Sequence, residues 1–192
     1  MNGQRLGPYS ASGGWTRILL LALILGLAFS GIVYAKTAKE IDTAVNATLQ
    51  KFYTQVKGGK ELADTAKGML VMPAVIKGAF IVGGQYGEGA LRVGGKTAGY
   101  YSLAAGSIGF SFGGEAKDIV ILFMTDAVLN QFKASKGWEV GVDGNVALIN
   151  IGGGERVDFL KINEPIIGFV FDVKGLMADI SLKGAKFTRI KR

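Results

Sequence analysis

The segment 81–91, IVGGQYGEGAL, places a carboxylate and a phenol among glycines. Glu88 could serve as an acid catalyst or a metal ligand with Tyr86 beside it. The structural alternative is that Glu88 accepts hydrogen bonds from free backbone amides. Acid–base chemistry by carboxylates needs a second acid, and the chain has none at a recognisable spacing from Glu88. The acids that the fold would have to bring to Glu88 are Asp118, Asp126 and Asp143.

Two glycine patterns resemble phosphate-binding loops. Gly84, Gly87 and Gly89 lack the dinucleotide spacing, and the ALRV that follows them is typical of a strand rather than a helix. The segment 94–97, GGKT, resembles a P-loop, but Ala90 occupies the position of the first glycine and AGYY follows instead of a helix. The glycines therefore predict turns, bulges and close packing of strands.

Residue composition excludes several kinds of site. The 192 residues include no cysteine and no histidine. Disulfides, thiolate metal sites, cysteine nucleophiles and histidine-based triads are therefore ruled out. We expect a protein without catalytic residues, metal or cofactor.

Residues 1–35 have the features of an export signal. Arg5 and Arg17 precede the uncharged run ILLLALILGLAFSGIVYA, and Val33 and Ala35 suit the −3 and −1 sites of a signal peptidase. Cleavage after Ala35 is favoured. The alternative is an uncleaved anchor, because about 18 apolar residues can just span a bilayer. Either case predicts one exported domain, 36–192, that is periplasmic or secreted, or anchored in the inner membrane with its body outside the cytoplasm.

The exported part has a mild basic bias. The whole chain has 22 basic and 15 acidic residues, and two of the basic residues lie in the leader. This bias permits anionic partners such as lipid head groups, but an ordinary solvated surface explains it equally well.

Periodicity predicts helices followed by many short strands. Thr37 and Glu40 form a capping-box pattern that begins a helix over 37–56, with the apolar stripe Ile41, Val45, Leu49, Phe52, Tyr53 and Val56. A short helix over 60–67 and a later one near 126–135, capped by Thr125, are also expected. Strand patterns fill most of the rest. They include a hairpin turn at Asp143-Gly144 and a final strand over 176–182. The fold class is α+β, with N-terminal helices packed on a glycine-rich antiparallel sheet or barrel.

The order of these segments resembles the SYLF domain family, a lipid-binding and actin-regulating domain described in yeast endocytic proteins. The resemblance is carried by KGMLVMPAVIKGAFIVGGQYGEGAL, AAGSIGFSFGGEAKDIVILFMTDAVLNQF, KGWEVGVDGNVALINIG and GLMADISLKGAKFTRI. It covers nearly all of 36–192 and is closest to secreted bacterial members. It implies a single domain without enzymatic activity, in which the helix 37–56 corresponds to the region implicated in membrane binding.

Family positions carry over residue by residue. Lys77 and the segment 175–184 match the family pattern, and so does its glycine-turn motif, here Gly83, Gly84, Tyr86, Gly87, Glu88 and Gly89. Two positions depart from it. Ser111 replaces a common Gln, and Tyr100-Tyr101 replaces a common Trp, which puts any ligand role of those positions in doubt.

We therefore expect an exported, non-catalytic lipid- or envelope-binding module. The basic residues that would contact an anionic phospholipid or membrane surface are Lys36, Lys39, Lys51, Lys57, Lys77, Arg92, Lys96, Lys183, Lys186 and Arg189. Core packing is the alternative role of the helix stripe, and a solvated terminus that of the basic tail. The alternative function is a structural or protein-interaction domain of the bacterial envelope without lipid binding. We expect no nucleic-acid partner and do not expect actin to be the native partner.

Overall fold

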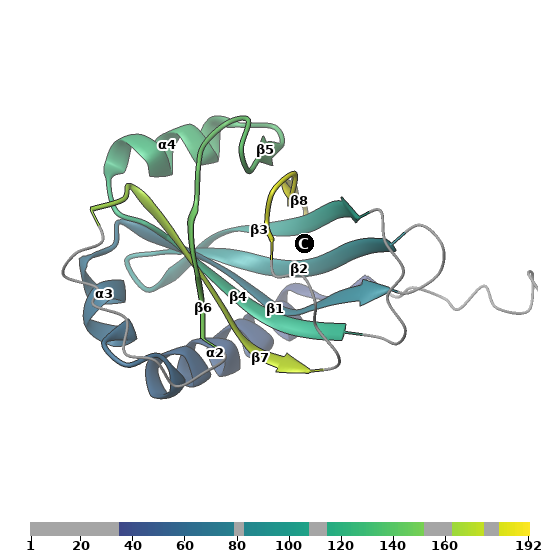
Figure 1. Cartoon of the computed structure of the whole chain (residues 1–192), viewed down its shortest axis with the longest axis horizontal. Coiled ribbons are helices and arrows are strands. Elements are labelled where there is room, and N and C mark those ends of the chain that lie inside the picture. The colour runs from purple at the N-terminus through teal and green to yellow at the C-terminus, as the bar shows by residue number, and fades with distance from the viewer. Residues whose placement is uncertain (1–34, 79–82, 108–114, 152–162, 175–180) are drawn as a thin grey trace, which may run out of the picture. The chain divides into compact units, whose positions relative to one another are not determined.

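The structure is a computed structural model that describes residues 35–78, 83–107, 115–151, 163–174 and 181–192 (Figure 1). The export signal, Ser111 and most of the expected strand 176–182 lie outside these ranges. Backbone contacts group Lys36–Arg192 as one compact unit. Within the described ranges, no helix combines the length and apolar character needed to cross a membrane.

The described helices begin and end where their capping residues predict. Helix α2 spans Ala38–Gln55, α3 spans Gly59–Thr65 and α4 spans Asp126–Ala134. The Thr37 hydroxyl accepts from the Glu40 amide, and the Glu40 carboxylate accepts from the Thr37 amide at 2.7 Å, so the capping box is present. Thr125 caps α4 in the same way by accepting from the Val128 amide.

The described strands form one eight-stranded sheet in the order β5-β8-β3-β2-β1-β4-β7-β6. Their bounds are β1 Gly68–Gly78, β2 Gly83–Val93, β3 Lys96–Ser107, β4 Glu115–Phe123, β5 Trp138–Glu139, β6 Ala147–Asn150, β7 Ile166–Lys174 and β8 Lys186–Ile190. Neighbouring strands run antiparallel except β6 and β7, which are parallel. The predicted α+β class is confirmed, and the sheet is mixed rather than purely antiparallel.

The sheet is curled, and its interior face is closed at one end by α4. Gly144 packs against both Trp138 of β5 and Ile166 of β7, so the two ends of the strand order approach each other. Phe132 of α4 has its ring centroid 4.9 Å from that of Tyr101 and 4.8 Å from that of Phe123. These buried aromatic and aliphatic side chains form the first hydrophobic core.

A second core lies on the outer face, where α2 and α3 pack on the side of the sheet opposite α4 (Figure 1). The apolar stripe of α2 is buried there, and the Phe52 ring lies 5.1 Å from that of Phe169. Burial of a Phe side chain stabilises the fold by about 1.5–3 kcal/mol. In this structure the stripe is therefore core packing, the alternative that the sequence left open.

The glycines of β2 leave space for a bulge in β1. The register between β1 and β2 shifts between Val71 and Ile76, and Ala74 has a φ of 46°. A Cβ added at Gly89 would lie 1.9 Å from the Val71 carbonyl oxygen, and one at Gly87 would lie 2.8 Å from the Val75 side chain. Only glycine fits at position 89, and at position 87 a Cβ would require the Val75 side chain to move, so the predicted structural role of these glycines is confirmed.

One local prediction was wrong, and one feature was missed. Asp143-Gly144 lies in a turn but joins no hairpin, because β5 pairs with β8 while β6 pairs with β7. The Asp143 carboxylate instead closes the turn by accepting from the Glu139 amide at 2.7 Å. The basic tail, whose role the sequence left open between a membrane contact and a solvated terminus, contains strand β8, and its Phe187 is buried against Trp138.

Candidate functional site

Part of the outer face of the sheet carries exposed apolar side chains with lysines at both ends. Strand pairing places one residue from each of six adjacent strands side by side: Lys174, Ala116, Ile76, Tyr86, Ala104 and Lys186. We call this set the outer row. Ile76 is 57% exposed and Tyr86 is 50% exposed, although most large apolar side chains of the described residues are buried. The row therefore combines an apolar centre with basic ends.

The bulge in β1 is the reason why Ile76 faces outward. Leu70 and Met72 belong to the interior core, and strict alternation would place Ile76 there as well. The extra residue in the bulge makes Val75 the next interior side chain and moves Ile76 to the outer face. Sequence reasoning missed Ile76 and Lys174, and the only signal was Pro73, which interrupts the strand pattern.

Glu88 lies on the same face, next to the outer row. Its carboxylate accepts a hydrogen bond from the Tyr86 hydroxyl at 2.8 Å and another from Arg192 at 2.5 Å. Burial and then this hydrogen bond to Glu88 raise the pKa of Tyr86 above its usual value. Glu88 therefore forms an ion pair with Arg192 and accepts a hydrogen bond from the Tyr86 hydroxyl. These side chains, and not the free backbone amides of the structural alternative, are its hydrogen-bond donors.

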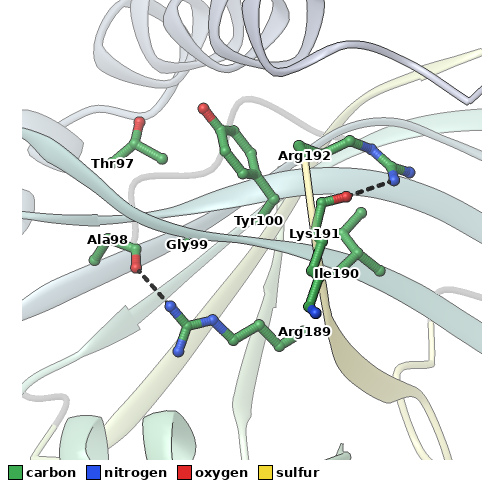
Figure 2. Close-up of a pocket in the computed structure, with 8 residues that line it drawn as sticks. All are labelled: Thr97, Ala98, Gly99, Tyr100, Arg189, Ile190, Lys191 and Arg192. Carbon is green, nitrogen blue, oxygen red and sulfur yellow. Dashed lines mark hydrogen bonds between the residues drawn. The ribbon is translucent and has the colours of Figure 1, made fainter.

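Arg192 also lines a shallow groove of about 530 Å³ between β3 and β8 (Figure 2). The groove is formed by residues 97–100 and 189–192. Arg189 donates to the Ala98 carbonyl oxygen at 3.4 Å, and the ring of Tyr100 points toward the helix (Figure 2). Neither Arg189 nor Lys191 forms an ion pair with a described acid, so this groove presents free positive charge.

The Asp42 carboxylate joins α2 to β2 and β3. It accepts hydrogen bonds from Thr97 at 2.7 Å and from Tyr100 at 2.9 Å, and it lies 3.2 Å from Arg92. Burial raises the pKa of Asp42, but these hydrogen bonds and the Arg92 charge outweigh it and hold the pKa below its usual value. Arg92 also donates to Asn46, so its positive charge is used within the fold.

Lys51 joins the other end of α2 to the sheet. Its ammonium donates to Asp172 at 2.5 Å and to Asp118 at 3.0 Å. Asp118 also accepts from the Ala74 amide at 2.8 Å, which satisfies the backbone of the β1 bulge. The hydrogen bonds to Asp172 and then Asp118 raise the pKa of Lys51, and the Lys51 hydrogen bond lowers that of Asp172.

The predicted contact residues therefore fall into two groups. Lys51, Lys77 and Arg92 form ion pairs with acids of the fold. The others are exposed and have no ion pair with a described acid: Lys36, Lys39, Lys57, Lys96, Lys183, Lys186 and Arg189. In the glycine-turn motif, Gly87, Glu88 and Gly89 are buried while Gly84 and Tyr86 are exposed.

The described acids do not gather into a metal site. No group of three or more metal-ligating side chains occurs within the described ranges. Asp118 and Glu88 each pair with a basic side chain, as given above. Asp126 is in the first turn of α4, and Asp143 closes the turn after β5.

Comparison with protein families gives a match over the second half of the chain. Residues 104–191 match the family described as Ysc84: Las17-binding protein actin regulator. This range contains the middle and closing segments of the resemblance in the sequence, from the end of β3 to the end of β8. The segment 67–91 lies outside it. No curated protein matches the chain.

Proposed function

Because residues 104–191 place the chain in the Ysc84, or SYLF, family of lipid-binding and actin-regulator domains, we propose that it is an exported, non-catalytic module that binds an anionic lipid surface of the cell envelope. Export rests on the leader 1–35, which carries basic residues before an apolar run. The native target would be a phospholipid surface rather than an actin filament, since an exported domain does not meet actin.

The outer row is the observation that carries this proposal. Its centre exposes Ile76 and Tyr86, and its ends expose Lys174 and Lys186. Interfacial surfaces use this combination, because apolar groups enter the headgroup boundary while lysines attract anionic lipid. Tyr suits the boundary in particular, because its ring is apolar and its hydroxyl is polar.

The free positive charge of Arg189 in the groove of Figure 2 does not extend this surface. Lys186 and Arg189 lie three residues apart on β8, and Arg189 pairs with Tyr101 of the interior core, so the two side chains leave opposite faces of the sheet. Each basic residue near an anionic surface contributes about 1 kcal/mol. Lys51 and Arg92 have no part in this contact, because acids within the fold hold their charges, and Lys77 has none because it lies on the interior face beside Glu115. Lys174 also lies 3.9 Å from Asp172, but its side chain remains 72% exposed.

The test is sedimentation of the full chain, in the form that expressing cells process, with anionic and with neutral vesicles. Lys174→Gln/Lys186→Gln should weaken binding to anionic vesicles about 30-fold at low salt, since two contacts of about 1 kcal/mol are lost. The matched control is Lys67→Gln/Lys133→Gln, which removes two exposed lysines outside the row. This control loses the same charge at positions outside the row, so its binding to anionic vesicles should fall far less.

Binding should also fall as salt rises, because exposed charges are screened. Equal binding to neutral and anionic vesicles would contradict the role of the lysines. No binding to either, together with a stable protein partner recovered without lipid, would favour the alternative of a protein-interaction domain of the envelope.

A further inference from the structure

The interior face of the sheet changes from apolar to polar along its strands. Near α4 it is lined by large apolar side chains such as Leu70, Ile121 and Phe123. At the opposite end of the same strands it carries four polar or charged side chains: Lys77 of β1, Gln85 of β2, and Glu115 and Lys117 of β4. We call these four the interior polar cluster.

Strand pairing brings the members of the cluster together. Lys77 is the direct partner of Gln85 on one side and of Glu115 on the other, so the three side chains lie in one row. Lys117 is two residues from Glu115 on the same face of β4. The Lys77 ammonium lies 3.7 Å from Glu115 Oε2, which is an ion-pair distance but too long for a hydrogen bond.

Two acceptor atoms of the cluster are buried without a hydrogen bond. Gln85 is 6% exposed and Glu115 is 3% exposed, and neither Gln85 Oε1 nor Glu115 Oε2 has a donor. Buried side-chain oxygens in folded proteins nearly always accept a hydrogen bond, and an unsatisfied one destabilises the fold. A packed apolar layer at this end would be at least as stable as this cluster. A contribution to stability alone therefore does not account for these side chains.

The cluster points to a particular ligand chemistry. Two oxygens without donors suit an ammonium group, and the loosely paired Lys77 ammonium has donors to spare for an anion beside it. Lys117, which is 1% exposed, lies on the same face and takes part in an interaction of its own. We propose that the interior polar cluster binds an amine–phosphate group, with the amine on Gln85 and Glu115 and the phosphate at Lys77.

This inference rests on the proposed function for one point, the source of the amine–phosphate group. A protein that binds a lipid surface would take this group from the head group of an ethanolamine phospholipid. It concerns other residues than the outer row, which faces the opposite side of the sheet. The outer row would hold the protein on the membrane surface, and the interior polar cluster would select one head group.

The experiment is calorimetric titration of the full chain with three probes: a short-chain phosphatidylethanolamine, a short-chain phosphatidylglycerol and free phosphoethanolamine. Gln85→Met and Glu115→Gln should each weaken binding of the ethanolamine lipid about tenfold, because the first removes an acceptor of the amine and the second removes the negative charge that pairs with it. Thr48→Val is the matched control, since Thr48 is a buried polar residue of α2, outside the cluster.

Thermal unfolding without ligand separates binding from folding. Gln85→Met keeps the side-chain length and removes a buried unsatisfied oxygen, so its melting temperature should equal or exceed that of the wild type. If Gln85 had a purely structural role, Gln85→Met would lower the melting temperature. Loss of binding together with unchanged or higher stability is the result expected of a ligand site.

Other results overturn all or part of the proposal. Equal binding of the ethanolamine lipid by wild type and Gln85→Met overturns the site. Equal affinity for phosphatidylglycerol overturns the role of the amine, and equal affinity for free phosphoethanolamine overturns the lipid source. The vesicle assay and the titration can fail independently of each other, because they test different residues. Lys174→Gln/Lys186→Gln should weaken binding to vesicles and leave binding of the short-chain lipid unchanged. A protein that does not sediment with vesicles but binds this lipid would refute the surface and keep the interior site.

Discussion

Arg192 Nη2 donates to Glu88 Oε1 at 2.5 Å, a contact that joins residues 104 positions apart in the chain. Glu88 is 6% exposed, so this hydrogen bond is made by a carboxylate that solvent hardly reaches. The pair fixes the end of the chain beyond β8 against β2, beside the outer row.

Removal of Arg192 should destabilise the fold. Arg192→Ala leaves the Glu88 carboxylate buried with only the Tyr86 hydroxyl, and we expect a loss of about 1.5–3 kcal/mol in the free energy of unfolding. Glu88→Met/Arg192→Met should recover most of this loss, because no buried charge is left without a partner. Urea unfolding at neutral pH measures both. A double variant as unstable as Arg192→Ala would contradict the importance of the pair.

Acid should weaken the link between α2 and the sheet. The Lys51 hydrogen bond lowers the pKa of Asp172, so the folded chain holds this proton less tightly than the unfolded chain. The resulting stability is present in full above about pH 4 and is lost as the pH falls through the folded pKa. In Lys51→Met the free energy of unfolding should change less over this pH range. The difference from the wild type should be about 1 kcal/mol or less, because Lys51 is partly exposed. Unfolding free energies between neutral and acid pH test this. Parallel curves for the two proteins would contradict it.

Asp42 should control the ionisation of Tyr100. The hydrogen bond to Asp42, then burial and the charge of Asp42, raise the pKa of Tyr100. In Asp42→Asn the negative charge is gone, so Tyr100 should ionise at lower pH, as seen by ultraviolet titration of the phenols. Tyr100→Phe identifies which part of the titration belongs to Tyr100. An unchanged curve in Asp42→Asn would show that the hydrogen bond is not made in solution.

The glycines facing the β1 bulge should differ sharply in tolerance. Gly89→Ala places a methyl group 1.9 Å from a backbone oxygen, and we expect a loss at or above the usual 1–3 kcal/mol for an overfilled site. Gly87→Ala meets a side chain that can move, so its loss should be smaller. Gly106 has no atom within 4 Å of an added Cβ, and Gly106→Ala should be neutral or slightly stabilising. Thermal unfolding gives the order, and a destabilised Gly106→Ala would contradict the geometry.

The sequence predicted the elements whose signals are local. The capping box at Thr37, the stripe on α2 and the Thr125 cap of α4 each depend on residues three or four positions apart, and each was confirmed. The glycine motif was also read correctly, because a nucleotide loop must be followed by a helix and this motif continues as a strand.

The features that the sequence did not predict depend on distant partners. Ile76 is exposed because a bulge changes the phase of β1, and that bulge is supported by Asp118 on another strand. Phe187 belongs to a strand because its neighbours across the sheet are Trp138 and Leu103, which no local pattern reveals. The interior polar cluster becomes visible only when pairing brings Lys77 between Gln85 and Glu115.

The place of β8 in the sheet has a consequence for the order of folding. β8 follows every other described strand in the chain, yet it lies between β5 and β3. The hairpins β1–β2 and β2–β3 can form from neighbouring residues, whereas the pairing of Tyr100 with Ile190 must close a long loop first. Until β8 arrives, the β3 edge and the aromatic contacts of Trp138 stay open to other chains. Folding should therefore end with a slow step in which β8 docks, and a chain that is still folding would have its greatest tendency to aggregate just before that step.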